Sequence, residues 1–157
     1  MEGTYPISRK GKKQKSVKES LAVPYASWIG VKANNNGDLI RKVESGFSYK
    51  TFEKLLDLLS ASMIELSDLL QIPRRTLTRR KKSGRFPPDE SERILRFSRV
   101  LDTAVELFEG DQPGAVGWLR APNRALNGET PLGMTKTEIG AREVENLIGR
   151  LEYGVFT

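Results

Sequence analysis

The densest group of chemically active side chains is a run of six cations between Arg74 and Lys82. No acidic residue occurs between Asp68 and Asp89 to neutralise it. A short segment of one charge sign, with Leu77 as its apolar residue, suits contact with phosphate, and arginine can also donate hydrogen bonds to base edges. The run therefore predicts a nucleic-acid-binding surface. The plainer alternative is a solvated helix face that happens to be basic.

The residues before and within this run predict two short helices joined by a tight turn. Residues 62–65 have the form of a capping box, which starts a helix, and Pro73 ends that helix and favours the start of the next. The small and apolar residues follow the spacing of a helix-turn-helix; they are Ser67, Leu70, Ile72 and Leu77. Gln71 stands where glycine is common in such turns, so we expect it to adopt a left-handed conformation.

In a helix-turn-helix the second helix lies in the major groove, with its N-terminal residues closest to the base edges. The residues that we expect to read bases are Arg74, Arg75 and Thr76, with Thr78 and Arg79 nearby. Those that we expect mostly to neutralise phosphates are Arg80, Lys81, Lys82 and Arg85. Because one short helix reads only a few base pairs, we also expect a homodimer on double-stranded promoter DNA. The apolar surface for it would come from helices at 47–59 and 89–108.

Composition narrows the chemistry further. The chain has 157 residues, which suits one domain or two small ones, and its formal net charge of +6 favours an acidic partner. It contains no cysteine and no histidine, which excludes disulfides, thiolate or imidazole metal sites, and Ser-His or Cys-His catalysis. We therefore expect no metal and no cofactor. No apolar run approaches the roughly 18 residues of a membrane span, so we expect no membrane association and a cytoplasmic protein.

The apolar periodicity predicts an all-α fold in three parts. Residues 1–37 form a basic, disordered arm, although residues 24–29 carry apolar side chains that could dock on the core. Residues 38–110 form the DNA-binding and dimerisation region and include a long helix near 89–108. Residues 111–157 form a separate C-terminal domain. Its last helix starts at a second capping box, Thr135 to Glu138, and ends at Gly154.

A second pattern occupies this C-terminal part. Its residues are Trp118-Leu119, Pro122-Asn123, Ala125-Leu126, Gly128, Pro131-Leu132, Gly140, Val144, Leu147, Arg150 and Gly154. Together they resemble the C-terminal, toxin-binding domain of the Xre/MbcA/ParS antitoxins, which pair with RES-domain toxins. Residues 76–80, 84–85 and 90–93 also match the helix-turn-helix half of the Xre antitoxins. The resemblance covers roughly residues 40–157.

This resemblance implies an antitoxin of a RES–Xre type II toxin–antitoxin module. It implies a Cro/repressor-like helix-turn-helix half that binds the operon's own promoter. It also implies a small helical domain that holds a RES-domain toxin, an enzyme that consumes NAD+. The antitoxin itself would not be an enzyme, and its C-terminal end, residues 150–157, would lie by the active-site cleft of the toxin.

The residues that we expect to contact the toxin are Trp118, Arg142, Glu145, Asn146, Arg150, Tyr153, Phe156 and Thr157. Trp118 has a competing role, because large aromatic side chains fill the cores of small helical domains. A tail carrying an aromatic side chain and a terminal carboxylate could plug the cleft, whereas most chain ends are simply frayed.

Two other functions remain open at this stage. The chain could be a stand-alone phage-type repressor whose C-terminal half only dimerises. It could also be an enzyme, in which case catalysis would rest on carboxylates such as Glu106 with Glu109 or Asp111. The simpler interpretation of those carboxylates is a solvated helix end.

Overall fold

The computed structural model describes residues 23–154, which fold into helices joined by short turns. The helices of the first part are α2 (Pro24–Ser27), α3 (Asn36–Ser45), α4 (Tyr49–Leu59), α5 (Met63–Leu70) and α6 (Arg74–Ser83). Those of the second part are α7 (Pro88–Leu107), α8 (Gln112–Leu119), the 3-10 helix η1 (Arg124–Leu126), α9 (Pro131–Met134) and α10 (Glu138–Tyr153). Residues 23–154 contain no β-strand, only an isolated bridge between Ser48 and Arg85. The all-α prediction is confirmed.

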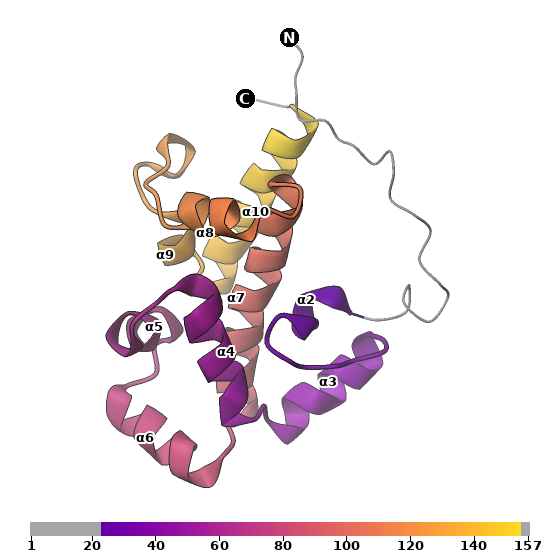
Figure 1. The fold of residues 1–157 in the computed structure, drawn as a ribbon, viewed down its shortest axis with the longest axis vertical. Coiled ribbons are helices and arrows are strands. Elements are labelled where there is room, and N and C mark those ends of the chain that lie inside the picture. The colour runs from indigo at the N-terminus through magenta and orange to yellow at the C-terminus, as the bar shows by residue number, and fades with distance from the viewer. Residues whose placement is uncertain (1–22, 155–157) are drawn as a thin grey trace.

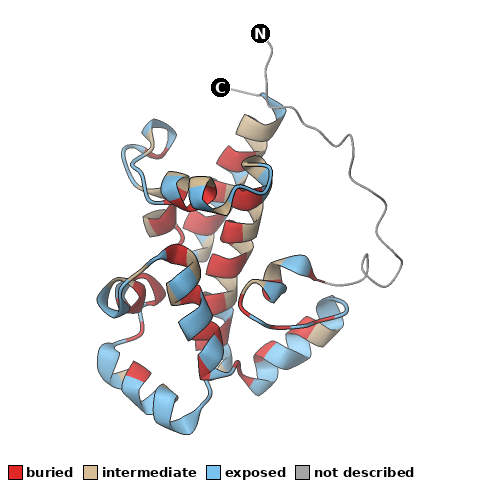
Figure 2. Cartoon of the chain, viewed as in Figure 1, coloured by how far each residue is buried: buried red, intermediate tan, exposed pale blue. Residues whose placement is uncertain are grey.

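Helix α7 is the centre of the molecule (Figure 1). It packs against α2, α3, α4 and α5 in the N-terminal half, and against α8 and α10 in the C-terminal half. Its buried apolar side chains are Ile94, Phe97, Val100, Leu101, Ala104 and Val105. Figure 2 shows this continuous buried stripe along α7, in contrast to α6, which is almost entirely exposed. Both halves of the chain are therefore built on one helix.

The caps of the helices follow the sequence signals, with one exception. Ser48 and Ser62 accept hydrogen bonds from the first turns of α4 and α5, as their positions predict. The prediction that α10 starts at Thr135 is wrong, because the cap is Thr137, whose hydroxyl accepts from the Gly140 amide at 3.0 Å. The Thr135 hydroxyl is buried and donates to the Pro131 carbonyl at 2.8 Å, so it ends α9 instead.

The first described residues are packed, which corrects the prediction of a disordered arm over residues 23–37. The Val23 amide donates to the Ala33 carbonyl at 3.0 Å, and the Trp28 indole donates to the Asp102 carboxylate on α7 at 2.8 Å. Ile29 is buried. These apolar side chains bury enough surface against α7 to offset the entropy of ordering the segment. The remainder of the predicted arm, residues 1–22, lies outside the described residues.

The apolar side chains predicted to form a dimer interface are not at the surface of the structure. The stripes of α4 and α7 are buried inside the chain and therefore cannot form an interface between copies. Large apolar side chains are exposed elsewhere, at Ile40, Met63, Ile64, Ile139 and Tyr153.

Candidate functional site

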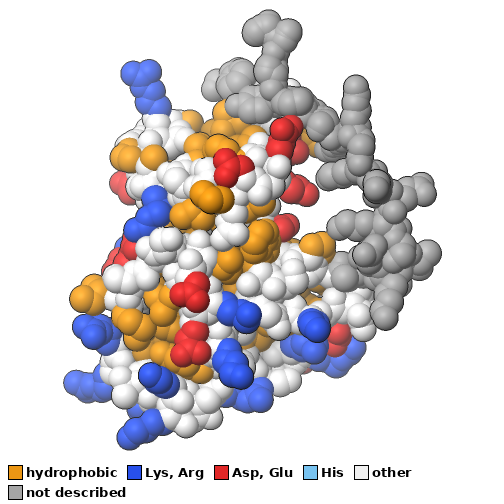
Figure 3. All heavy atoms as spheres, in the orientation of Figure 1, with side chains coloured by type: hydrophobic (Ala, Val, Ile, Leu, Met, Phe, Trp, Pro, Cys, Tyr) orange, Lys and Arg blue, Asp and Glu red, His pale blue; other side chains and the backbone are white. Residues whose placement is uncertain are grey.

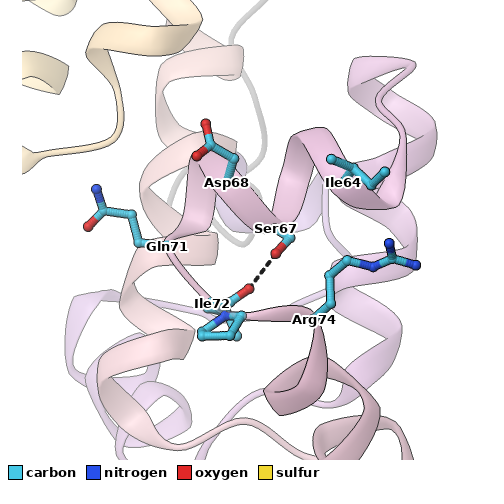
Figure 4. Close-up of a pocket in the computed structure, with 7 residues that line it drawn as sticks. Ile64, Ser67, Asp68, Gln71, Ile72 and Arg74 are labelled. Carbon is cyan, nitrogen blue, oxygen red and sulfur yellow. Dashed lines mark hydrogen bonds between the residues drawn. The ribbon is translucent and has the colours of Figure 1, made fainter.

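The turn between α5 and α6 fixes the angle between the two helices. Gln71 has φ 55° and ψ 43°, the left-handed conformation that the sequence predicts. The buried Ser67 hydroxyl donates to the Ile72 carbonyl at 2.6 Å, across the turn (Figure 4). On the other side, the Arg93 guanidinium of α7 donates to the Gln71 carbonyl at 3.2 Å. The carbonyls of Gln71 and Ile72 in the turn therefore both have side-chain partners, and the turn is held from α5 on one side and from α7 on the other.

Leu77 is the one buried side chain of helix α6. Its exposed cations are Arg74, Arg75, Arg79, Lys81 and Lys82. Within residues 23–154 none of these cations forms an ion pair with a carboxylate. Lys and Arg side chains gather over α6 at the lower end of the face in Figure 3. This surface is therefore a positive patch whose charge is not neutralised by any carboxylate of residues 23–154.

Two of the predicted phosphate-contacting arginines have partners within the chain. The Arg80 guanidinium donates to both Glu90 carboxylate oxygens, at 2.8 and 2.9 Å, and Glu90 is buried. The hydrogen bond that Arg80 donates to the Glu90 carboxylate raises the pKa of Arg80 above its ordinary value. Arg85 donates to the Gly46 carbonyl at 2.7 Å, just after the end of α3. Both side chains hold the fold together, which limits their freedom to reach a phosphate.

The predicted base-reading residues lie at the exposed start of α6. Arg74 and Arg75 are exposed in its first turn. The Arg79 guanidinium donates to the Thr76 hydroxyl at 3.2 Å, and the Thr78 hydroxyl donates to the Arg74 carbonyl at 3.1 Å. The arginines of the first turn are thus exposed and pair with no carboxylate of residues 23–154, whereas both threonine hydroxyls take part in hydrogen bonds within the helix.

A shallow hollow of about 460 Å³ lies between α5 and α6. Its lining residues are Ile64, Ser67, Asp68, Gln71, Ile72, Pro73 and Arg74. In Figure 4 the Ile64 and Arg74 side chains lie on one side of it, and those of Asp68 and Gln71 lie on the other. Asp68 also pairs with Lys136, at 2.9 Å, from the turn before α10. The C-terminal half of the chain therefore reaches the edge of the helix-turn-helix formed by α5 and α6.

In the C-terminal half, α10 lies along α7 and is fastened to it by ion pairs. Arg99 of α7 donates to Glu145 at 2.8 Å and to Glu138 at 3.0 Å, and Arg96 pairs with Glu138 at 3.3 Å. Burial raises the pKa of the Glu138 carboxyl, but the charges and hydrogen bonds of Arg99, Arg142 and Arg96 outweigh burial and lower it. Glu145, predicted to contact a toxin, therefore has a partner inside the chain.

The other predicted toxin-contacting residues fall into three groups. Trp118 is half-buried and packs against Phe108, with ring centroids 6.5 Å apart, which matches the alternative of a core role. The second group of predicted toxin-contacting residues lies on the outward face of α10 and consists of Arg142, Asn146, Arg150 and Tyr153. Phe156 and Thr157 lie outside the described residues.

Sequence reasoning missed Ile139, which is 78% exposed in the first turn of α10. It occupies the same helical face as Arg142, Asn146 and Tyr153, since three, seven and fourteen residues separate them from it. We call Ile139, Arg142, Asn146, Arg150 and Tyr153 the α10 face. The sequence did contain a signal for this face, namely an isoleucine outside the apolar stripe of the helix. A face that only contacts solvent has no need of an isoleucine.

The carboxylates considered for catalysis lie at a helix junction. The Asp111 carboxylate caps α8 by accepting from the Gly114 amide at 3.0 Å, and Glu109 is left-handed, with φ 53°. Asp111 therefore has a structural role. Among the described residues no group of acidic side chains could hold a metal ion, and no helix is long and apolar enough to cross a membrane.

Comparison with protein-family models gives two adjoining matches. Residues 38–99 match the antitoxin Xre-like helix-turn-helix domain. Residues 103–154 match the antitoxin Xre/MbcA/ParS C-terminal toxin-binding domain. The boundary between them falls inside α7. The first match contains α5 and α6, and the second contains the α10 face.

Curated relatives carry the same description. A protein named Antitoxin Xre from Yersinia enterocolitica is 43% identical over 130 residues, which cover 82% of this chain and 88% of that protein. One from Photorhabdus laumondii is 53% identical over 72 residues, 46% of this chain and 49% of that protein. One from Pseudomonas putida is 28% identical over 114 residues, 72% of this chain and 70% of that protein.

Proposed function

This chain belongs to the Xre antitoxin family, and we propose that it represses its own promoter and neutralises a RES-domain toxin that consumes NAD+. The RES identity of the partner rests on the resemblance of residues 118–154 to antitoxins that pair with such toxins. Membership of an antitoxin family points to a binding protein, so we propose that the chain catalyses no reaction and acts in the cytoplasm. A stand-alone repressor is not favoured, because a toxin-binding domain model matches the C-terminal half.

The observation that carries the DNA-binding proposal is the unneutralised positive charge of α6 on a helix-turn-helix. Arg74 and Arg75 project from its first turn, the part of such a helix that meets base edges. Arg79, Lys81 and Lys82 are exposed further along and would neutralise phosphates. We assign no phosphate contact to Arg80 or Arg85, because the chain already occupies their guanidinium groups.

For the toxin, we propose that the α10 face is the contact surface. It combines two exposed apolar side chains, Ile139 and Tyr153, with the polar Arg142 and Asn146 between them. Apolar and aromatic side chains carry most of the affinity of protein interfaces, while a polar surrounding gives specificity. Glu145 and Trp118 would support this face from inside the molecule. Glu145 pairs with Arg99 of α7, and Trp118 packs against Phe108 at the C-terminal end of α7.

Co-expression tests the proposal as a whole. A RES-domain partner expressed with this chain should co-purify with it, and cells should keep their NAD+. The purified chain should bind promoter DNA of its own operon in preference to an unrelated duplex at physiological salt. Failure of co-purification would contradict the proposal that the chain binds a RES-domain toxin. Equal affinity for both duplexes would contradict the proposal that it recognises its own promoter. Light scattering on the same sample measures whether the chain is a homodimer, as we propose.

Binding and inhibition should be separable, because we propose that residues 153–157 obstruct the toxin while the rest of α10 holds it. A chain truncated after Leu151 should bind promoter DNA as before and keep weak association with the toxin. It should fail to prevent NAD+ loss in cells that express the toxin. The control is Glu152→Gln in the full-length chain, which retains the end. Full protection by the truncated chain would show that inhibition does not involve these residues.

A further inference from the structure

The net positive charge of the chain is concentrated in two short segments. Helix α6 carries six cations and no acidic residue, a charge of +6. Residues 1–22, which we call the basic segment, carry six lysines and arginines but only two glutamates, a charge of +4. Because the whole chain has a net charge of +6, all its other residues together carry −4. Away from α6, the folded part of the chain is therefore acidic on balance and opposes the approach of DNA.

Residues 23–33 fix the point at which the basic segment joins the folded part. The Val23 amide donates to the Ala33 carbonyl at 3.0 Å, and the Trp28 indole donates to the Asp102 carboxylate of α7 at 2.8 Å. In Figure 1, α2 lies to the right of α7 and α5 lies to its left, and both helices pack against α7. The basic segment is therefore attached at a fixed place, across α7 from the helix-turn-helix.

The length of the basic segment allows contact with phosphates beyond the base pairs that α6 would meet. Its cations are Arg9, Lys10, Lys12, Lys13, Lys15 and Lys18. A chain spans at most about 3.6 Å per residue, so Lys18 can lie up to about 18 Å from Val23, and Arg9 up to about 50 Å. Residues 9–18 span up to about 35 Å, which is about one turn of duplex DNA, and the duplex presents one phosphate charge per ~1.7 Å of its axis. Several phosphates are therefore within reach of the six cations at once.

The type of cation differs between the two segments. Five of the six cations in the basic segment are lysines, whereas four of the six in α6 are arginines. The planar guanidinium of arginine donates two hydrogen bonds to guanine in a fixed geometry, whereas the ammonium of lysine is a compact, strongly hydrated point charge. A lysine-rich segment therefore suits phosphates, and the arginines at the start of α6 suit base edges.

We propose that the basic segment is a second DNA-binding element, which binds phosphates flanking the base pairs contacted by α6 and reads no bases. This inference rests on the DNA binding proposed above for α6. Lysines that neutralise phosphates release counterions, so the basic segment raises the affinity for every duplex and makes that affinity depend on salt. Sequence preference stays with α6. The competing outcome is a basic segment that pairs with the acidic remainder of the chain and contributes nothing to DNA affinity.

The test is a full-length variant in which glutamine replaces all six cations of the basic segment. Binding of promoter DNA and of an unrelated duplex is titrated from about 50 to 200 mM salt. The slope of log affinity against log salt should become shallower by about 2 or more for both duplexes, since each phosphate contact contributes about 0.9. The ratio of the two affinities should stay within about twofold of that of the unaltered chain, because no base contact is lost. An unchanged midpoint of urea unfolding confirms that the variant retains the fold.

A matched pair of triple variants separates the basic segment from net charge. In the first variant, glutamine replaces Lys12, Lys13 and Lys15. In the second, it replaces three exposed cations of the folded part outside α6, namely Lys32, Lys42 and Arg124. Both variants lose three charges, but the first should reduce the salt slope by at least about 1 more than the second.

Three results overturn the proposal. One is a slope that changes by less than about 2 in the variant without the six cations, and another is a smaller difference than about 1 between the triple variants. The third is a loss of sequence preference when the six cations are removed, which would mean that the basic segment reads bases. In each case the unaltered chain still prefers its promoter, so the proposed function stands. Equal affinity of the unaltered chain for both duplexes would contradict promoter recognition, while the slopes would still decide the role of the basic segment.

Discussion

Helices α6 and α10 each carry six charged residues but use them in opposite ways. In α6 all six are cations, and Arg80 is the one with a carboxylate partner among the described residues. In α10 the charges are mixed, and Glu138 and Glu145 pair with arginines of α7. Charge that the fold does not use internally is available to a charged partner such as DNA. Charge that fastens α10 to α7 is not available in this way, so the toxin contact proposed for α10 would depend on exposed side chains such as Ile139 and Tyr153.

The largest effect is expected from a substitution that displaces α10 from α7 and leaves α6 in place. A Cβ added at Gly140 would lie 1.8 Å from the Met134 carbonyl oxygen, which is backbone and cannot give way. Gly140→Ala should therefore cost more than about 3 kcal/mol of stability, measured by urea unfolding, and abolish toxin binding. Gly149→Ala is the matched control in the same helix, because nothing lies within 4 Å of the added carbon. It should stabilise the chain by about 0.5–1 kcal/mol. Equal effects of the two substitutions would contradict the packing described here.

The next largest effect separates Arg80 from the other cations of α6. Arg80→Ala leaves the buried Glu90 carboxylate without its partner, which should cost about 3 kcal/mol in urea unfolding. Lys82→Ala removes an exposed cation of the same helix and should change stability by less than about 0.5 kcal/mol. If the arginine variant were as stable as the lysine variant, Arg80 would have no structural role and could be counted among the DNA contacts.

Within the exposed cations, position along α6 should decide between sequence preference and general affinity. Arg75→Ala should reduce discrimination between promoter and unrelated DNA by about 2 kcal/mol, since a guanidinium can bind guanine through two hydrogen bonds. Lys82→Ala should weaken binding to both duplexes alike and reduce the slope of log affinity against log salt by about 1. Binding titrations over a range of salt concentrations measure both quantities. A loss of discrimination in the lysine variant would reverse the assignment.

The smallest effect concerns the pH dependence of the α10 attachment. The pKa of Glu138 is lowered in the fold, so its ion pairs stabilise the chain above about pH 4.3, the ordinary value for glutamate, and the contribution disappears as pH falls through the lowered value. Glu138 is partly exposed, so the difference between the unaltered chain and Glu138→Gln should be below about 1 kcal/mol at pH 7. It should shrink towards zero at pH 3 in thermal unfolding. Glu143→Gln, an exposed neighbour, should show no such trend; a difference that grows in acid would contradict this assignment.

Local signals were sufficient for much of the fold. The turn at Gln71, the single core residue Leu77 and the long helix near 89–108 all follow from spacing and capping within a few residues. The start of α10 was ambiguous at this level, because Thr135 and Thr137 can both cap a helix. The choice depends on the buried bond from Thr135 to Pro131, which requires the folded α9.

Contacts between distant residues account for what the sequence did not reveal. The bond between Trp28 and Asp102 spans 74 residues, so the apolar side chains of residues 24–29 indicated that they could dock on the core but not that α7 is the partner. The pairs of Arg80 with Glu90 and Arg99 with Glu145 likewise depend on how helices are placed side by side. The residues expected at the DNA and at the toxin remain predictions, but these pairs show which of them the fold already uses.

Helix α7 has a consequence for how this antitoxin is lost. The two family domains meet between residues 99 and 103, yet the helix continues through that point from Pro88 to Leu107. Ile94 and Phe97 fall on one side of the boundary, and Leu101 and Ala104 on the other, all in one buried stripe. Both halves share the core of this helix, so the unit that folds is larger than either unit of sequence similarity, and we expect unfolding to be all-or-none. Destruction of one molecule by a protease would therefore end the proposed promoter binding and the proposed toxin binding together.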